Sequence, residues 1–404
     1  MGPEQNGITV RAAGGWEPRY QALDAWRGLA CLMVVVHHAA YAVSWAEAGD
    51  SWPRWLVLLA VRRMDLGVAL FFVISGYCIA ASAAASARRN EAPTAFLTRR
   101  FWRIYPPYWF ALLGFGAWIA WFDAAGLAHY YCGPFGVQMD RPHDLDWRQW
   151  VGNLTLTETW RPHLFGPDRN VFTGVAWSLC FEEQFYMICF LILWLAPRRL
   201  FAALAGVSVV VASVRGYAWW VGGLSAFKGT FPLLWHEFAV GLVVYYRLVV
   251  AARKPEKRLI EVSLALLCGA GLWTGGRTTA VAAGFGLLLI AGRRWDGLAA
   301  SAFWLVPLRA CGRRCYSIYL AHLPFGVIGN QWLYELGVTS FWSRVLVMVP
   351  LASAVGIAAG WFFHSAVESR FLGAPPTVGG LFSRLRSRRR RQPSLAGASS
   401  AGST

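Results

Sequence analysis

The stretch "DAWRGLACLMVVVHHAAY", residues 24 to 41, is apolar enough to enter a lipid bilayer, yet it carries three basic side chains. Arg27 stands near its start, and His37 and His38 follow further along. Ionisable groups inside a bilayer are costly, and those that occur there usually serve a function. The stretch therefore predicts a membrane-spanning helix that contributes to a functional site.

The composition of the whole chain agrees with this interpretation. Of its 404 residues, 56% are hydrophobic and 15% are charged, and 23 are tryptophans. The apolar residues form runs, several of them close to the length that crosses a hydrocarbon core, so we expect an all-α integral membrane protein with about ten transmembrane helices in one bundle. The expected spans cover residues 25–46, 65–86, 105–126, 174–196, 199–214, 230–250, 259–275, 278–292, 315–334 and 341–364.

The formal charge of +17 is distributed unevenly along the chain. If the N-terminus is cytoplasmic, 27 of the 38 Lys and Arg residues fall on the cytoplasmic side of these spans. Such a bias is typical of positive-inside loops. We therefore expect a multi-pass protein of the cell membrane with both termini in the cytoplasm. The charge is not read as a nucleic-acid surface, because its one continuous basic patch, "RLRSRRRRQ", fits a tail that touches anionic lipid.

The same pattern predicts three regions. Residues 1–24 form a cytoplasmic N-terminal segment, 25–372 a multi-span membrane domain, and 373–404 a basic, disordered cytoplasmic tail. The longest outward loop, 127–173, is polar, aromatic and rich in Gly and Pro, so we expect a structured loop or lid. Segment 51–63 is amphipathic and is expected to lie along the outer membrane interface.

Common soluble-enzyme motifs and metal sites are not found in the sequence. The eight cysteines include no CxxC pair and indicate neither a disulfide framework nor a zinc site. There is no nucleophile elbow, phosphate-binding loop, dinucleotide fingerprint or HExxH motif. Any chemistry is therefore expected within the membrane domain, without a metal.

Helical phase separates the two histidines of the first span. A helix turns about 100° and rises about 1.5 Å per residue, so the eleven steps from Arg27 to His38 return within about 20° of three full turns. The two side chains then share a face, about 16 Å apart along the axis. His37 points about 80° away from that face. The phase favours His38 as the functional partner of Arg27, although either histidine could simply bond a neighbouring helix.

Three arginines precede the third expected span in "TRRFWRIYPPYWF", residues 98 to 110. Arginine suits phosphate because its planar guanidinium offers a fork of donors. Arg100 and Arg103 are one helical turn apart and could bind one phosphorylated ligand together with Arg99. The alternative is that these are ordinary positive-inside anchors beside a belt of aromatic residues.

The block "WSLCFEEQFY", residues 177 to 186, places a carboxylate in an apolar helix. An unpaired carboxylate there would be costly, so Glu182 needs a basic partner, water or a function. We expect Glu182 at a depth similar to that of His38, where it could orient the imidazole. The other polar or aromatic candidates of this block are Trp177, Ser178 and Tyr186.

Two further blocks supply supporting candidates. "RRCYSIYLAHLPF", residues 313 to 325, places Ser317, Tyr319 and His322 at the start of the ninth span. "LFFVISGYCIA" adds Ser75 beside Gly76, which favours close helix packing. Helix–helix contact is the preferred explanation for Ser75, for His236 in "LLWHEFAVG", and for the His364 and Glu368 pair near the chain's end.

Taken together, these blocks resemble the acyltransferase 3 family of membrane acyltransferases. "LDAWRGLACLMVVVHHA" is similar to the Arg-x10-His signature, and "GVALFFVISGYCIA" and "RRFWRIYPPYW" are similar to the second- and third-span motifs. "WSLCFEEQFY" is similar to the block that carries an acidic residue at the position of Glu182. "CGRRCYSIYLAHLPF" and "VESRF" are similar to the closing motifs, so the resemblance runs from residue 20 to residue 372.

The sequence departs from the family pattern at two places. Ala69 stands where members often carry an acidic residue, and Ser369 and Arg370 stand where Arg-Pro is common. No hydrolase-like domain follows the last span, so the chain resembles the stand-alone branch of the family.

The resemblance implies transfer of an acyl group, with acetyl expected, from acyl-coenzyme A to a hydroxyl. The acceptor classes are carbohydrates, glycolipids and natural products. In this interpretation Arg99, Arg100 and Arg103 bind the donor's phosphates, and Arg27 holds the donor or stabilises charge. His38 either abstracts the acceptor proton or takes the acyl group covalently. Glu182 positions His38 or the acceptor.

One rival class shares the multi-span layout and the buried charges. A transporter or flippase of a glycolipid or small metabolite would also fit, but such proteins often have two related halves. No such repeat is seen here, and the charged motifs gather in the first half of the chain. The sequence leaves the oligomeric state open.

Overall fold

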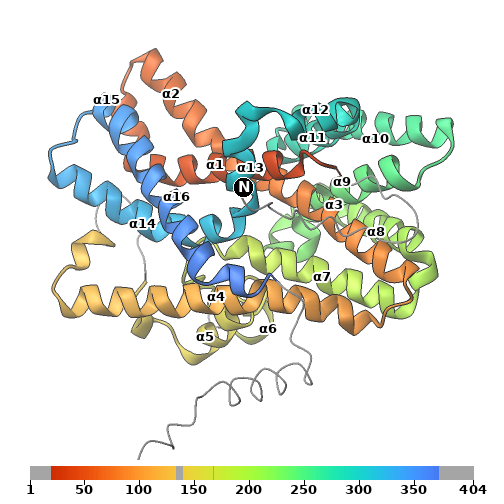
Figure 1. Ribbon diagram of the computed structural model, residues 1–404, viewed down its shortest axis with the longest axis horizontal. Helices are drawn as coiled ribbons and strands as arrows, with labels where there is room; N and C mark the ends of the chain where they lie inside the picture. Colours follow the sequence, from red (N-terminus) through yellow and green to blue (C-terminus); the bar gives the residue numbers. More distant parts are fainter. Residues whose placement is uncertain (1–19, 133–139, 167, 373–404) are drawn as a thin grey trace, which may run out of the picture.

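The computed structural model of the chain describes residues 20–132, 140–166 and 168–372 (Figure 1). These residues form helices joined by short turns, and they contain no β-strand. The expected all-α class is therefore confirmed. The expected tail, 373–404, and residues 1–19 of the expected N-terminal segment lie outside the described residues.

The first half of the chain contains eight α-helices in the described residues. They alternate between long apolar helices and short helices in the connections. Their bounds are α1 Leu23–Ala39, α2 Trp52–Arg62, α3 Gly67–Arg88, α4 Pro93–Ala124, α5 Trp147–Leu154, α6 Pro162–Phe165, α7 Trp177–Leu195 and α8 Leu200–Trp220.

The second half continues this pattern, with π-helical turns after α9 and before α16. The bounds are α9 Trp235–Tyr245, its π-helical continuation Tyr246–Val250, α10 Lys254–Trp273, α11 Arg277–Gly292, α12 Asp296–Ser301, α13 Val306–Arg313, α14 Cys315–Glu335, α15 Phe341–Ser343, the π-helical Arg344–Met348 and α16 Val349–Ala366. Short 3-10 turns lie at Ala40–Ala42, Trp45–Ala48, Arg63–Leu66, Ala128–Tyr130, Pro142–Asp144, Pro197–Arg199, Leu224–Phe227, Phe231–Leu233, Arg293–Trp295, Phe303–Leu305 and Glu368–Arg370.

Four helical segments of the described residues are long and apolar enough to cross a membrane, judged by length and composition. They are Trp52–Arg88, Trp177–Leu195, Pro197–Trp220 and Phe341–Arg370. Other expected spans form shorter helices: α1 has 17 residues and α11 has 16, below the roughly 20 that cross a bilayer. The count of ten spans and the cytoplasmic termini therefore stay predictions.

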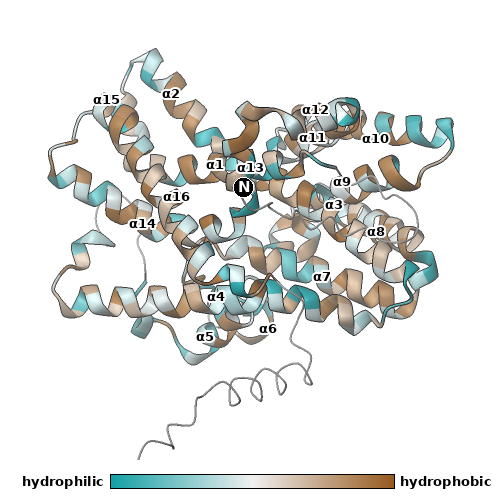
Figure 2. Cartoon of the chain, viewed as in Figure 1, coloured by the Kyte–Doolittle hydropathy of each residue, from teal (hydrophilic) through white to brown (hydrophobic). Residues whose placement is uncertain are grey.

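The outer surface of the helices is strongly apolar, and Figure 2 shows hydrophobic residues along most of them. Trp273 is 92% exposed, Phe303 84% and Trp220 83%. Large aromatic side chains rarely stand this free in water, but they suit a lipid surface. The surface therefore agrees with a membrane location.

Helix α1 occupies the centre of the molecule and contacts α3, α13, α14 and α16 (Figure 1). Glycine allows close helix crossings nearby. A Cβ on Gly241 of α9 would lie 2.0 Å from the carbonyl oxygen of Val73, and one on Gly76 of α3 would lie 2.1 Å from that of Phe238. Only glycine fits at both positions, so α3 and α9 meet backbone to backbone. This crossing fixes α3, which contributes residues to the site described below.

Helix α4 begins earlier than the expected third span. It is one helix of 32 residues that starts at Pro93 rather than near residue 105, and it contains Pro106 and Pro107. At 1.5 Å per residue it is about 48 Å long, more than the hydrocarbon thickness of about 30 Å. The arginines expected before the span thus lie on the helix itself, and its rigid backbone sets their spacing.

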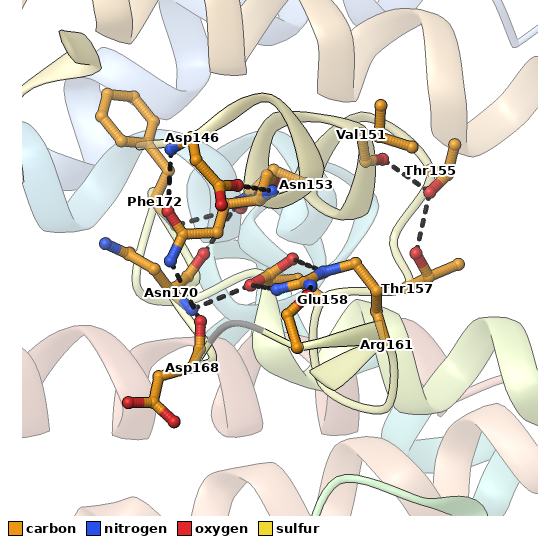
Figure 3. Close-up of polar contacts among 12 residues, drawn as sticks. Asp146, Val151, Asn153, Thr155, Thr157, Glu158, Arg161, Asp168, Asn170 and Phe172 are labelled. Carbon is orange, nitrogen blue, oxygen red and sulfur yellow. Dashed lines mark hydrogen bonds and ion pairs between the residues drawn. The ribbon is translucent and has the colours of Figure 1, made fainter. Parts of the chain in front are cut away.

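The loop expected on the outer side folds, in its described residues, into a compact unit held by buried polar groups (Figure 3). Glu158, fully buried, accepts two hydrogen bonds of 2.9 Å from Arg161 and one of 2.9 Å from the backbone N–H of Asn170. Asn153 accepts from the N–H of Phe172 at 3.0 Å and donates to the carbonyl of Asn170 at 2.8 Å. In the part that the structure describes, the expected structured loop is confirmed.

Aromatic side chains of α4 hold this unit against the bundle. The hydroxyl of Tyr108 donates to the carbonyl of Asn153 at 2.9 Å. The indole of Trp109 donates to the carbonyl of Leu154 at 2.8 Å. These bonds satisfy carbonyls at the end of α5, which have no partner within their own helix. The belt of aromatic residues expected near this span thus attaches the loop.

Candidate active site

A cavity of about 130 Å³ lies where α1, α3, α4, α7 and α14 meet. It is called the arginine cavity here, because three arginines line it. Eight of the residues singled out from the sequence line it. They are Arg27, Ser75, Arg100, Arg103, Ser178, Glu182, Tyr186 and Tyr319.

Arg27 reaches the cavity from α1. Its side chain is 18% exposed, and its guanidinium donates to Asp24 at 3.0 Å and to the sulfur of Cys78 at 2.9 Å. Asp24 lies one turn earlier on the same helix and balances the charge. The guanidinium is therefore held in place before any ligand binds.

Arg100 and Arg103 enter the cavity from α4, one helical turn apart. The guanidinium of Arg100 lies 5.2 Å from the ring centroid of Tyr186 and 5.8 Å from that of Phe96. Such cation–π contacts orient an arginine without using its N–H donors. Arg103 is exposed. The two side chains can thus offer donors to an anion.

Arg99 has a different environment from its two neighbours. It donates to Glu91 and to Ser86, both at 2.8 Å, and it does not line the arginine cavity. Hydrogen bonds from Arg89 and then from Arg99 lower the pKa of Glu91 to about 2. The ion pair is therefore present at neutral pH. The expected group of three phosphate-binding arginines is divided into two that share a cavity and one that is paired elsewhere.

Glu182 is the carboxylate of the arginine cavity. Its Oε1 atom accepts a hydrogen bond of 2.6 Å from Ser75 of α3 and another from the hydroxyl of Tyr186. Ser178, Glu182 and Tyr186 are four residues apart, so α7 presents all three on one face. Two donors on one oxygen leave Oε2 without a hydrogen-bond partner among the described residues.

Tyr319 of α14 closes the cavity opposite α7. Its hydroxyl lies 2.7 Å from that of Ser178 and also bonds the carbonyl of Val175. Trp177 does not line the cavity and packs its ring against Phe72 and Phe181. The block "WSLCFEEQFY" therefore contributes Ser178, Glu182 and Tyr186 to the site, and Trp177 to the packing behind it.

His38 lies in a separate small cavity of about 10 Å³, beside His322. No hydrogen bond joins His38 and Glu182 in the described residues, and the two side chains line different cavities. The Nδ1 atom of His38 lies 2.9 Å from the carbonyl oxygen of Val34 and 3.2 Å from Nε2 of His322. Similar depth along two helices was the basis for expecting Glu182 to orient the imidazole of His38, and depth does not fix the direction in which a side chain points.

The carbonyl partners assign the protons of both neutral rings. Nδ1 of His322 lies 3.0 Å from the carbonyl oxygen of Ile318. Since a carbonyl only accepts, Nδ1 carries the proton in each neutral imidazole, and Nε2 of His322 accepts from His38. Nε2 of His38 then carries a lone pair and has no hydrogen-bond partner among the described residues. It is the basic atom of the pair.

His37 has a different set of contacts, as the helical phase predicts. Its Nδ1 lies 3.0 Å from the carbonyl oxygen of Arg62, and its Nε2 lies 3.1 Å from the hydroxyl of Tyr41. Nδ1 thus holds α1 against the end of α2, and Nε2 bonds Tyr41 in the turn directly after α1. His37 is satisfied structurally, whereas His38 keeps one nitrogen available.

Ser317 lies outside both cavities. It is fully buried and donates to Glu368, which also contacts Nδ1 of His364 at 2.8 Å. This buried group connects the start of α14 to the end of α16. The helix-contact explanation offered for His364 and Glu368 therefore extends to Ser317.

Among the lining residues with a polar or thiol side chain, the sequence patterns missed three: Cys78, Cys315 and Tyr316. Cys78 lies in an apolar run, where a cysteine is interpreted as a small hydrophobic residue. Cys78 follows Ser75 by one helical turn, so its spacing carried the signal. The described residues contain no group of three His, Cys, Asp or Glu side chains that could hold a metal ion.

Comparison with known proteins identifies the class. Residues 20–365 match the acyltransferase 3 family model, which is described as an acyltransferase domain. Because the match covers most of the chain, this protein belongs to that family of membrane acyltransferases and is an acyltransferase enzyme. The rival class of transporter is therefore not supported.

Two curated relatives carry names that agree with this class. The chain is 28% identical over 356 residues to a protein of Komagataeibacter xylinus named as membrane-bound transacylase BcsY, covering 83% of this chain and 80% of the relative. It is 26% identical over 395 residues to the acyltransferase MdmB of Streptomyces mycarofaciens, covering 88% and 93%. No solved structure matches the chain.

Proposed function

We propose that the protein transfers an acyl group, with acetyl as the expected case, from acyl-coenzyme A to a hydroxyl of a carbohydrate, glycolipid or natural product. The observation that carries this proposal is the arginine cavity, in which Arg27, Arg100 and Arg103 face Glu182. The cavity combines donors for a polyanion with an acceptor for a hydroxyl.

The arginines account for the donor substrate. Coenzyme A carries several phosphates, and guanidinium groups bind phosphate through charge-assisted, often bidentate hydrogen bonds. Arg100 and Arg103 present such donors from one turn of α4, and Arg27 adds a third charge from α1. The donor's phosphates would therefore lie between α1 and α4, with the thioester directed towards α7 and α14.

Glu182 is suited to bind the acceptor. Its Oε1 is already occupied by Ser75 and Tyr186, so Oε2 remains to accept a hydrogen bond from a substrate hydroxyl. His38 supplies the base through Nε2, which takes the proton as the hydroxyl oxygen attacks the thioester carbon. The carbon–sulfur bond then breaks, and the coenzyme A thiolate leaves and takes up a proton. The covalent route through an acyl-histidine stays open.

The carboxylate of Glu182 and the imidazole of His38 line different cavities in the structure. Tyr319 lines the arginine cavity, and its ring centroid is 6.0 Å from that of His322, which bonds His38. The proposed reaction therefore requires the acceptor hydroxyl to reach His38 past Tyr319. Catalytic contacts are often long in a ligand-free enzyme and shorten when substrate binds.

The test uses purified protein in detergent with acetyl-coenzyme A labelled in its acetyl group. Release of coenzyme A thiol and transfer of label to an extracted glycan or lipid fraction are measured together. We expect both, with transfer dependent on the hydroxyl-bearing fraction. A protein that binds acetyl-coenzyme A but releases no thiol with any fraction would contradict the proposal. Label trapped on protein without acceptor would select the acyl-histidine route.

A further inference from the structure

A second and larger cavity, of about 490 Å³, lies between α8, α9, α10 and α11. It is called the α8–α11 cavity here. These helices lie together on one side of the molecule, opposite α14 and α16 (Figure 1). It shares no lining residue with the arginine cavity. The function proposed above does not use it.

One end of the α8–α11 cavity is polar. It is lined by Arg215 near the end of α8, His236 near the start of α9, Thr274 just after α10 and Thr279 near the start of α11. The ends of four helices therefore meet at this level. Trp219, Trp220 and Trp273 are exposed beside it. Tryptophan gathers where hydrocarbon meets headgroups, so this end lies at a membrane interface.

The rest of the cavity is apolar and runs inward along the helices. Val243 lies seven residues beyond His236 on α9, and Leu264 lies ten residues before Thr274 on α10. These separations correspond to about 10 Å and about 15 Å along the helix axes. Most of the other wall residues are aliphatic. The shape is that of a site for a hydrocarbon chain whose polar end stays at the interface.

Arg215 gives the polar end its charge. Its Nη1 lies 2.7 Å from Nδ1 of His236, and it also donates to the carbonyl oxygen of Leu233. Nη2 and Nε have no hydrogen-bond partner among the described residues. His236 is fixed in turn by Thr279, whose hydroxyl is 2.8 Å from Nε2. The guanidinium is thus oriented by one nitrogen and has its remaining donors available to an anion.

The carboxylate of Glu237, next to His236 in the sequence, makes no hydrogen bond to the guanidinium of Arg215 in the described residues. Glu237 is 2% exposed, does not line the cavity, and has an Oε1 atom 3.7 Å from Nε2 of His236. Among the lining residues that the structure describes, Arg215 is the only Lys, Arg, Asp or Glu. The electrostatics of the cavity mouth therefore favour a negative group.

We propose that the α8–α11 cavity binds an anionic phospholipid, with one acyl chain between the helices and the phosphate on Arg215. The acyl chain matches the apolar end of the cavity between the helices. The phosphate matches the polar end at the membrane interface. A guanidinium binds the phosphate of an anionic lipid more strongly than the phosphate of a zwitterionic lipid, because the ammonium group of the zwitterionic headgroup competes for that phosphate. The protein would therefore select phosphatidylglycerol over phosphatidylcholine.

The test measures lipid binding to delipidated, purified full-length protein by native mass spectrometry. Phosphatidylglycerol, phosphatidylcholine and inorganic phosphate are titrated separately. We expect a one-to-one complex with phosphatidylglycerol and none with phosphate alone. Arg215→Met should weaken phosphatidylglycerol binding about tenfold, as expected for a lost charge-assisted bond, and remove the preference over phosphatidylcholine.

A second pair of variants tests the chain site without touching the charge. Gly216 lines the cavity, and a Cβ there meets no atom within 4 Å, so Gly216→Leu should fill space and weaken both lipids. Gly206 on the same helix is equally open but does not line the cavity, so Gly206→Leu is the matched control. Unchanged selectivity in Arg215→Met, or equal binding by Gly216→Leu and Gly206→Leu, would overturn the proposal. Acyl transfer is not measured, so failure leaves the proposed reaction unaffected.

Discussion

At the residue scale, the proposed chemistry depends on which nitrogen or oxygen of each polar side chain is still available. His37 uses both ring nitrogens on neighbouring groups, whereas His38 uses Nδ1 only. Glu182 receives two hydrogen bonds on a single oxygen. Adjacent or similar residues thus differ in what they can offer a substrate. The two predictions at this scale compare such neighbours.

The first prediction concerns the two histidines. His38→Ala should lower the rate of acyl transfer about 100-fold or more, because a general base typically contributes 10² to 10⁴. His37→Ala should retain most of the rate, since both of its ring nitrogens already bond Arg62 and Tyr41 and neither is available to a substrate. Thiol release from acetyl-coenzyme A, measured at equal amounts of folded protein, gives both values. A larger loss in His37→Ala than in His38→Ala would exchange the assigned roles.

The second prediction concerns the three arginines of α4. Arg100→Gln or Arg103→Gln should raise the KM for acetyl-coenzyme A about tenfold, because each removes a charged donor from the arginine cavity. Arg99→Gln is the matched variant one position away, and its side chain is paired with Glu91 instead. Its KM should change little. Equal effects of all three substitutions would show that the cavity does not define the donor site.

At the scale of elements, close crossings and buried polar groups decide how the helices meet. Gly76 and Gly241 bring α3 and α9 into backbone contact, and this places Ser75 of α3 opposite α7. Glu158 and Arg161 instead hold the outward loop together (Figure 3). The first device positions α3, which lines the arginine cavity, whereas the second stabilises a loop from which no described residue lines it.

The third prediction tests the polar core of that loop. Glu158→Gln should lower the free energy of unfolding by about 3–5 kcal/mol, because it removes the negative charge that faces the buried guanidinium of Arg161. The side chain of Arg89, by contrast, is 59% exposed in its pair with Glu91. Arg89→Gln should therefore cost less than about 1 kcal/mol. Thermal unfolding followed by size-exclusion chromatography ranks the two. Equal melting temperatures would mean that the buried pair is not structurally important.

At the scale of the whole molecule, the exposed aromatic surface and the uneven charge describe how the protein sits in a bilayer. Four segments qualify as spans by length and composition. The positive-inside bias additionally predicts an even number of spans with cytoplasmic termini.

The fourth prediction tests this topology. A fluorescent protein fused after Thr404 should fluoresce, and alkaline phosphatase fused at the same position should be inactive, because the former folds in the cytoplasm and the latter requires the outside. A phosphatase fusion within 140–166 should be active. An active C-terminal phosphatase fusion would overturn the even-span topology.

Many residues of the candidate site could be predicted from the sequence. Their distribution between two separate cavities could not. Helical phase distinguishes His38 from His37, and in the continuous helix α1 the two histidines have different hydrogen-bond partners. The block "WSLCFEEQFY" supplied Ser178, Glu182 and Tyr186 as candidates, and all three line the arginine cavity. The relation of Glu182 to His38 depends on the rotation of two helices about their axes, and in the structure the two side chains line different cavities. Neither periodicity nor composition contains that rotation.

The sequence by itself determined the membrane class, the helical fold and the family, because apolar runs, charge bias and short motifs are local properties. Only the tertiary structure decided which polar groups meet. Ser75 and Glu182 are 107 residues apart, and His38 and His322 are 284 apart. Their contacts depend on how closely each pair of helices packs and at what angle, which side chains from the entire bundle determine together.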